Sequence, residues 1–132
     1  MESSAEEAVR HLAESINRGD VEAALEVCHP EIEFLSVLAV SGLRYQGHDG
    51  IRQYFADVAA TWSEWKVEIH LVALAPDGRV VIVMTMHSRG MESGVELADQ
   101  TAHVWTLKED KLLHNQPYRD PEEALRSVGA LP

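Results

Sequence analysis

Three polar side chains lie at alternating positions of a predicted β-strand, residues 94–107. Asp99, Thr101 and His103 follow one another on one face of this strand, with apolar residues before and after them. Successive side chains of a strand point to opposite faces, so these three point the same way. Burying unpaired polar groups costs free energy, and an ordinary core-facing strand avoids three in succession. The pattern therefore indicates a strand that lines a small-molecule cavity.

His103 and Asp99 are the candidate catalytic residues. A histidine exchanges protons near neutral pH and can act as a general acid or base. The alternative is a structural histidine whose ring nitrogens bond to neighbouring protein groups. Asp99 lies ~13 Å from His103 along a regular strand, so the two bond directly only if a bulge shortens that distance. Asp99 otherwise lies in water at the mouth of the cavity.

Aromatic residues on the apolar faces of other predicted elements could contribute to the cavity wall. Core packing explains such residues by default, although one or two are expected to contact a ligand. The candidates for ligand contact are Phe34, Tyr54, Trp62 and Trp105, with Ser36 as a small residue of the same wall.

No pattern in the sequence indicates a metal or an organic cofactor. Histidine pairs with the spacing of a zinc-binding helix are absent, and Cys28 has no second soft ligand nearby. The sequence contains neither a glycine-rich phosphate loop nor a nucleophile elbow. We therefore expect no metal and no cofactor.

The predicted elements follow the order α, α, β, α, then four strands and a short helix. Amphipathic spacing and capping residues predict helices over residues 5–18, 21–28, 51–62 and 121–128. Alternation predicts strands over residues 31–37, 65–74, 80–88, 94–107 and 111–119, with a loop over 41–47. The strand 80–88 begins with apolar residues on both faces, which indicates a central or covered strand. This order predicts an α+β domain with helices on one side of a curved antiparallel sheet.

Length and composition restrict the class of protein. A chain of 132 residues fits a single domain, residues 1–132. Its net charge of −11, from 22 acidic and 11 basic residues, repels phosphate and argues against nucleic-acid binding. No apolar run approaches the ~18 residues that span a bilayer, and no signal peptide is visible. The single cysteine suits a reducing compartment, so we expect a cytoplasmic protein without a membrane partner.

Five short segments, taken in their order and spacing, resemble one known family. They are NRGD at 17–20, HPEIEF at 29–34, YQGHDGIR at 45–52, AHVWTL at 102–107 and YRD at 118–120. Over nearly its whole length the chain resembles the SnoaL-like branch of the NTF2-like superfamily. The resemblance implies a cone-shaped α+β barrel, in which a strongly curved mixed or antiparallel sheet wraps around three helices and leaves an apolar pocket. A short C-terminal helix follows, and the outer face of the sheet is expected to form a homodimer.

The resemblance also implies that two polar residues of the last strand face the cavity. Asn115 and Arg119 have the parity of inward positions in this family, which makes both candidates for substrate binding. An inward Arg119 would hold a carboxylate or enolate oxygen. The alternative for Arg119 is a salt bridge to an acid on a helix or at the rim.

Matching the family's enzymes to this chain leaves one chemistry open. Two of the three catalytic positions of the steroid isomerases fall at Leu12 and Ser36, which cannot do that work, and the acid of the epoxide hydrolases falls at Pro117. Polyketide cyclases use an inward Asp or His on the long strands, which Asp99 or His103 could supply.

Two functional hypotheses follow. The first is a protein that binds a small hydrophobic ligand, with or without cofactor-independent acid/base catalysis of the cyclase or isomerase type on a carbonyl compound. The second is a non-catalytic dimerisation or ligand-sensing module of the same fold.

Overall fold

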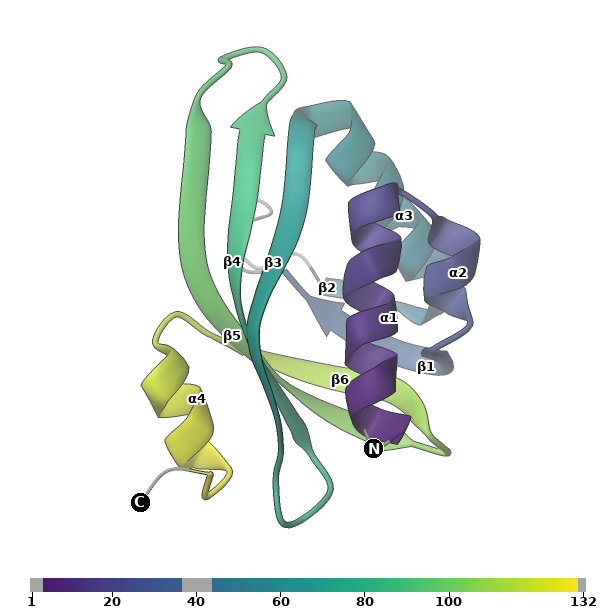
Figure 1. Ribbon diagram of the computed structural model, residues 1–132. Helices are drawn as coiled ribbons and strands as arrows, with labels where there is room; N and C mark the ends of the chain where they lie inside the picture. Colours follow the sequence, from purple (N-terminus) through teal and green to yellow (C-terminus); the bar gives the residue numbers. More distant parts are fainter. Residues whose placement is uncertain (1–3, 37–43, 131–132) are drawn as a thin grey trace.

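The computed structural model describes residues 4–36 and 44–130 (Figure 1). The helices are α1 (Ser4–Arg18), α2 (Val21–Leu25), α3 (Gly47–Thr61) and α4 (Pro121–Ser127). The strands are β1 (Cys28–Leu35), β2 (Arg44–Gln46), β3 (Trp62–Leu74), β4 (Val80–Gly90), β5 (Glu96–Lys108) and β6 (Lys111–Tyr118).

The strands form one curved sheet in the order β2-β1-β6-β5-β4-β3. The pair β1 and β6 is parallel, and the other neighbouring pairs are antiparallel. Figure 1 shows β1 and β6 running across the view while β3, β4 and β5 run along it. Helices α1, α2 and α3 lie on one side of the sheet, and α4 lies on the other. The predicted α+β fold with a strongly curved sheet is confirmed.

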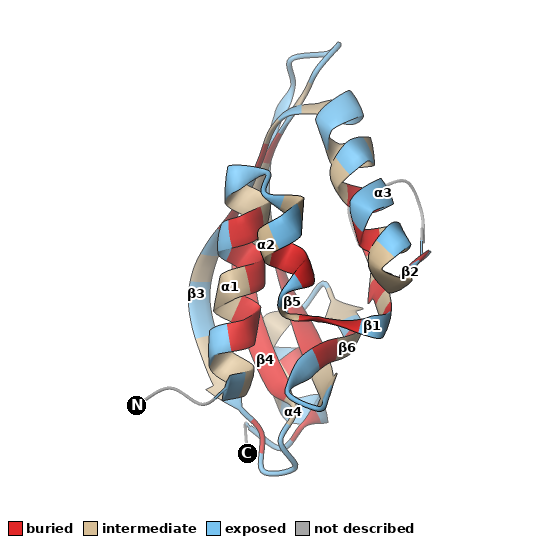
Figure 2. Cartoon of the chain, turned by 90° about the vertical axis from the view of Figure 1, so that its right-hand side faces the viewer, coloured by how far each residue is buried: buried red, intermediate tan, exposed pale blue. Residues whose placement is uncertain are grey.

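Strand β4 buries side chains on both faces of the sheet. On the inner face, Ile82 and Met84 belong to the apolar core that also contains the α1 residue Leu12. On the outer face, Val81 and Val83 pack in a second core with residues of α4. Figure 2 shows buried residues in α1 and in the adjoining strands, whereas much of α3 is exposed. The sequence predicted a central or covered strand over 80–88, and the burial of both faces of β4 confirms it.

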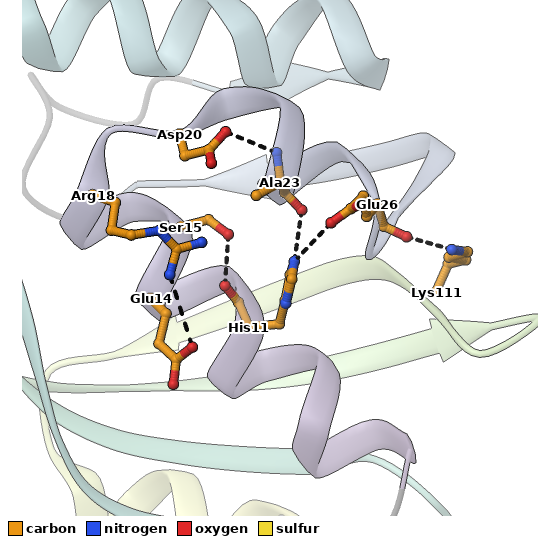
Figure 3. A network of polar contacts seen from close by, with 8 residues as sticks. All are labelled: His11, Glu14, Ser15, Arg18, Asp20, Ala23, Glu26 and Lys111. Carbon is orange, nitrogen blue, oxygen red and sulfur yellow. Dashed lines mark hydrogen bonds and ion pairs between the residues drawn. The ribbon is translucent and has the colours of Figure 1, made fainter.

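A network of polar contacts fixes α2 against α1 (Figure 3). His11 Nε2 lies 2.8 Å from the carbonyl oxygen of Ala23 and 3.3 Å from the carboxylate of Glu26. Asp20 Oδ1 accepts a hydrogen bond of 3.1 Å from the backbone N–H of Ala23, which caps α2 at its N-terminus. Lys111 donates to the carbonyl of Glu26 and ties this helix pair to β6. The network therefore holds α2 against the middle of α1 and ties α2 to β6.

The start of β1 differs from the prediction. Residues 21–28 were expected to be helical, yet α2 ends at Leu25 and β1 begins at Cys28. Cys28 pairs with Leu112, and the register shifts between Cys28 and Glu33. Pro30 lies in this irregular stretch, where its missing N–H removes no regular ladder bond. The His-Pro pair was interpreted as the end of a helix, but the strand passes through it.

Further boundaries differ from the prediction, and α3 begins at Gly47 instead of residue 51. Arg44–Gln46 forms β2 within the expected loop, whose residues 41–43 lie outside the described ranges. A strand of three residues is too short for alternation to reveal it. Trp62 was assigned to the third helix, yet it begins β3 and pairs with Gly90. Its aromatic side chain fits the apolar stripe of a helix and the face of a strand equally well.

Candidate functional site

A cavity of about 50 Å³ lies between α1 and the inner face of the sheet. Of the predicted site residues, Phe34, Ser36, Tyr54, His103 and Trp105 line it. The lining residues that were not predicted to bind a ligand are Val9, Leu12, Ala13, Ile16, Trp65, Val67, Ile82, Met84, Met86 and Thr101. Most of these are apolar residues at inward positions of α1, β3 and β4, so amphipathic spacing was the available signal.

Among the titratable residues that line the cavity, His103 is the candidate for chemistry. It lies in the middle of β5, opposite Ile82 of β4 and Pro117 of β6, and is 9% exposed. Its ring contacts Phe34 and Trp105 edge-on, with centroids 6.1 and 6.4 Å away. Burial disfavours the charged imidazolium and lowers the pKa of His103 from its ordinary value of 6.5 to about 4. The imidazole is therefore neutral at physiological pH.

Asn115 determines which nitrogen of His103 carries the proton. Its Oδ1 accepts from the backbone N–H of Leu35 at 2.7 Å, and its Nδ2 donates to the Leu35 carbonyl at 2.9 Å. These two bonds fix the orientation of the amide, so the group that lies 3.4 Å from His103 Nδ1 is a donor. With this donor beside it, Nδ1 is the acceptor, and we assign the proton of the neutral ring to Nε2. None of the described residues bonds to Nε2, which leaves an N–H donor available at the cavity.

Asn115 was predicted to contact the substrate, and the structure gives it a different place. It is fully buried and is not among the residues that line the cavity. Its amide joins β6 to the end of β1 across 80 residues of sequence. Asn115 is therefore a positioning residue, because it acts on the cavity through His103.

Arg119 was expected to face the cavity, and this expectation is wrong. Strand β6 ends at Tyr118, so the alternation of a strand no longer governs the next side chain. Arg119 is exposed and does not line the cavity.

Asp99 does not lie beside His103. The pairing of β4 and β5 runs without a shift from Met86–Asp99 to Ile82–His103, so no bulge shortens the distance between the two side chains. Asp99 is half-buried and does not line the cavity. The structure thus separates the two predicted catalytic residues by four regular strand positions.

The polar groups of Tyr54 and Thr101 are used within the protein. Trp65 Nε1 donates to the hydroxyl of Tyr54 at 2.7 Å, and Thr101 Oγ1 donates to the carbonyl of Tyr118 at 2.8 Å. Burial raises the pKa of Tyr54, so this phenol stays protonated. Phe34 and Trp105 stack with centroids 5.8 Å apart and an interplanar angle of 8°. The cavity therefore presents aromatic surface and few free polar atoms.

Trp62 was predicted to contact the ligand of the cavity but lines a different space, which we call the outer cleft. The outer cleft has a volume of about 280 Å³ and lies between the C-terminal end of α1, the helix α3 and the start of β3. Ile16, Tyr54 and Trp65 line both the outer cleft and the cavity. These three residues form the wall between the two spaces.

The described residues offer no metal site and no reactive thiol. Within residues 4–36 and 44–130, no three His, Cys, Asp or Glu side chains are grouped so that they could hold a metal ion. Burial raises the pKa of the Cys28 thiol to about 12, which suppresses the reactive thiolate. In the same ranges, none of the helices is long and apolar enough to cross a membrane.

Comparison with protein families gives a match to the SnoaL-like domain over residues 9–115. No curated protein matches the sequence. Among solved structures, an NTF2-like protein of unknown function from Burkholderia pseudomallei has a TM-score of 0.78 at 20% identity, over 98% of this chain and 100% of that one. TerC, crystallised with polyporic acid, has a TM-score of 0.76 at 21% identity, over 96% and 98%.

A third similar structure is a proposed polyketide cyclase from Xanthomonas campestris, with a TM-score of 0.75 at 16% identity, over 96% of this chain and 97% of that one. A protein with a ketosteroid isomerase-like fold from Catenulispora acidiphila, in complex with trimethylamine, gives 0.75 at 18% identity, over 96% and 94%. At these identities the likenesses show the fold and leave the chemistry open.

Proposed function

The chain belongs to the SnoaL-like domain family, and on that basis we propose that its cavity binds a small hydrophobic compound with a carbonyl group. The observation that carries the proposal is the neutral ring of His103, which Asn115 holds with its proton on Nε2. This N–H can donate to a carbonyl oxygen while the apolar wall holds the rest of the ligand. The ligands in the structures of TerC and of the Catenulispora acidiphila protein support small-molecule binding on this fold.

The size of the cavity restricts the ligand. A volume of about 50 Å³ gives room for roughly three to five water molecules. Met84 and Met86 lie in the wall, and methionine side chains are unbranched and adapt readily to new neighbours. The ligand is therefore either small or enters as these side chains rearrange.

A second candidate function is catalysed enolisation of the bound carbonyl compound, which the likeness to a proposed polyketide cyclase favours. In this reaction His103 Nε2–H donates to the carbonyl oxygen while the neighbouring C–H bond breaks and an enolate forms. Water takes the released proton, because no carboxylate lines the cavity among the described residues. A neutral histidine stabilises the enolate oxygen in this scheme and remains protonated on Nε2.

Binding of acetophenone and of α-methylstyrene, in which a CH₂ group replaces the carbonyl oxygen, tests the binding proposal. The indole signal of Trp105, which lines the cavity, is the NMR readout. We expect His103→Leu to weaken acetophenone binding about 5-fold and to leave α-methylstyrene binding unchanged, because only the ketone uses the N–H. Thr101→Val is the matched control, since its hydroxyl bonds within the protein. Equal effects of His103→Leu on both compounds contradict the proposal.

Exchange of the acetophenone methyl protons in D₂O tests the catalytic candidate separately. Enolate formation releases a methyl proton, and deuteration of the enolate carbon by D₂O then returns the ketone with a deuteron in its place. We expect wild-type protein to accelerate this exchange and His103→Leu to abolish the acceleration. Binding without accelerated exchange retains the binding function and removes the catalytic one.

The homodimer is a further part of the proposal. Helix α4 covers Val81 and Val83 on the outer face of the sheet, so a partner chain would use the part that α4 leaves open. That part carries polar pairs, His70 with Thr85 and Glu68 with His87. Light scattering at micromolar concentration is expected to give the mass of two chains, and the mass of one chain contradicts the dimer.

A further inference from the structure

The outer cleft is the larger of the two spaces and opens beside the cavity. Its volume is about 280 Å³, against about 50 Å³ for the cavity. Its lining residues belong to the end of α1, the helix α3 and the start of β3, elements whose places in the fold can be followed in Figure 1. The Tyr54–Trp65 hydrogen bond of 2.7 Å lies in the wall that separates it from the cavity.

The charged residues that line the outer cleft are both cationic. Arg18 comes from the C-terminal end of α1 and Lys66 from β3, and no acidic residue is among the lining residues described. The whole chain carries a net charge of −11. A cationic rim in such a chain is a local reversal of charge, which attracts anions to this opening.

The charged groups of Arg18 and Lys66 are both available to bind an anionic ligand. The Arg18 guanidinium lies 4.0 Å from the Glu14 carboxylate, and the two side chains are 54% and 68% exposed, so this ion pair contributes little. Figure 3 shows Arg18 and Glu14 on the outside of α1. Lys66 donates to the carbonyl of Asn17, and none of the described carboxylates forms an ion pair with it.

The remaining wall of the outer cleft suits an aromatic ring. Trp62 is half-buried, and its ring lies 5.2 Å from the ring of Trp65 at an interplanar angle of 34°. Phe55 and Val58 of α3 line the same space. Aromatic and aliphatic surface beside two cations matches a ligand with a ring at one end and an anion at the other.

We propose that the outer cleft binds an aromatic carboxylate, with its ring against Trp62 and its carboxylate held by Arg18 and Lys66. This site lies beyond the cavity of the proposed function and does not depend on His103. The guanidinium of Arg18 offers a pair of parallel N–H donors to a carboxylate, and Lys66 adds a point charge.

Arg18 and Lys66 also lie near the negative, C-terminal end of the α1 dipole. An alternative role for both is therefore to stabilise this helix end, without binding a ligand. Backbone hydrogen bonds already satisfy two carbonyl groups at this helix end. Gly19 N–H donates to the Ile16 carbonyl at 3.1 Å, and Asp20 N–H donates to the Ser15 carbonyl at 2.9 Å. A structural role predicts lower stability on substitution without any change in carboxylate binding. The two roles are therefore separable by experiment.

Titration of ¹⁵N-labelled protein with naphthalene-2-carboxylate tests the proposal, because each tryptophan reports a different place. Trp62 lines the outer cleft, Trp105 lines the cavity, and Trp65 lies in the wall between them. We expect the indole signal of Trp62 to shift with millimolar affinity, Trp65 to follow, and Trp105 to stay. Neutral naphthalene-2-carboxamide is the matched probe and is expected to bind at least 5-fold more weakly.

Any of three results overturns the proposal. They are a larger shift at Trp105 than at Trp62, equal binding of the carboxylate and the carboxamide, or no shift at Trp62. A shift at Trp105 alone places the probe in the cavity, so it rejects this second site and leaves the binding proposal for the cavity standing.

Substitutions of the two cations complete the test. Arg18→Gln and Lys66→Gln are each expected to weaken carboxylate binding about 3-fold, and the double variant about 10-fold, as for exposed ion pairs. Lys66→Arg keeps the charge and is expected to retain binding. Lys108→Gln, an exposed change of the same charge on β5, is the control and is expected to have no effect. Equal losses in Lys108→Gln and Lys66→Gln overturn the proposal, because general charge then explains the binding.

Discussion

The cavity and the outer cleft share a wall but differ in how they can recognise a ligand. The cavity is small and largely apolar, and the buried, neutral His103 lines it. The outer cleft is larger and carries the permanent charges of Arg18 and Lys66. Burial explains the difference, since a charge is stable where water reaches it and is disfavoured where water does not. The two proposals accordingly assign a neutral carbonyl compound to the cavity and an organic anion to the outer cleft.

The tryptophans of the two spaces are expected to give the largest contrast in stability. Trp105 is 2% exposed and stacks on Phe34, so Trp105→Ala should lower the free energy of unfolding by about 4 kcal/mol. Trp62 is half-buried at the outer cleft, and Trp62→Ala should cost about 1 kcal/mol. Urea denaturation of both variants measures the difference. Equal losses would show that the outer cleft is as tightly packed as the cavity.

Two asparagines that bind a strand backbone in the same way give the second contrast. Asn115 holds Leu35 from the buried side, and Asn17 holds Val67 of the edge strand β3 through bonds of 2.7 and 2.9 Å. Asn115→Ala leaves buried backbone groups unpaired and should cost about 3 kcal/mol. Asn17 is half-buried, so water can replace its amide and Asn17→Ala should cost about 1 kcal/mol. Urea denaturation compares them, and a larger loss for Asn17→Ala contradicts this interpretation.

The pH dependence of stability gives a third contrast. The pKa of His103 falls from 6.5 to about 4 on folding, so the unfolded chain binds the proton more tightly. The stability that this neutral ring contributes is complete above pH 6.5 and is lost as the pH falls through 4, by about 3 kcal/mol in total. His103→Gln should remove this part of the pH dependence of the unfolding free energy. If the unfolding free energy changed with pH equally in the wild type and the variant, this pH dependence would come from groups other than His103.

A substitution in the wall between the cavity and the outer cleft is expected to have the smallest effect on stability. Tyr54→Phe removes the acceptor of the Trp65 indole N–H and should cost about 1 kcal/mol in urea denaturation. The ring of Phe retains the packing, so naphthalene-2-carboxylate should still shift Trp62 first. A new shift at Trp105 in this variant would show that the hydrogen bond keeps the two spaces apart.

The parts of this molecule that follow from sequence are those with a repeated pattern. Apolar residues on both faces of 80–88 predicted a covered central strand, and the polar positions of 94–107 predicted that His103 lines a cavity. Both predictions rest on side-chain alternation, which a long strand repeats often enough to be recognised. A three-residue strand such as β2 does not repeat it.

The interactions that tune the site could not be predicted in this way. Asn115 forms hydrogen bonds with Leu35, 80 residues away in the sequence, and no local sequence pattern indicates such a partner. Arg119 kept the parity of an inward position, but the strand ends one residue earlier. Trp62 has the character of a cavity residue, and its place in the outer cleft depends on how α3 meets β3.

The state of the His103 ring is the point on which the proposed function depends most directly. Long-range ¹H–¹⁵N NMR of the imidazole, followed from pH 8 to pH 4, measures both the pKa and the protonated nitrogen. We predict a neutral ring with its proton on Nε2 down to about pH 5, and a titration midpoint near pH 4. A midpoint near 6.5, or a proton on Nδ1, would contradict the proposal that His103 presents a fixed neutral N–H donor to a carbonyl ligand.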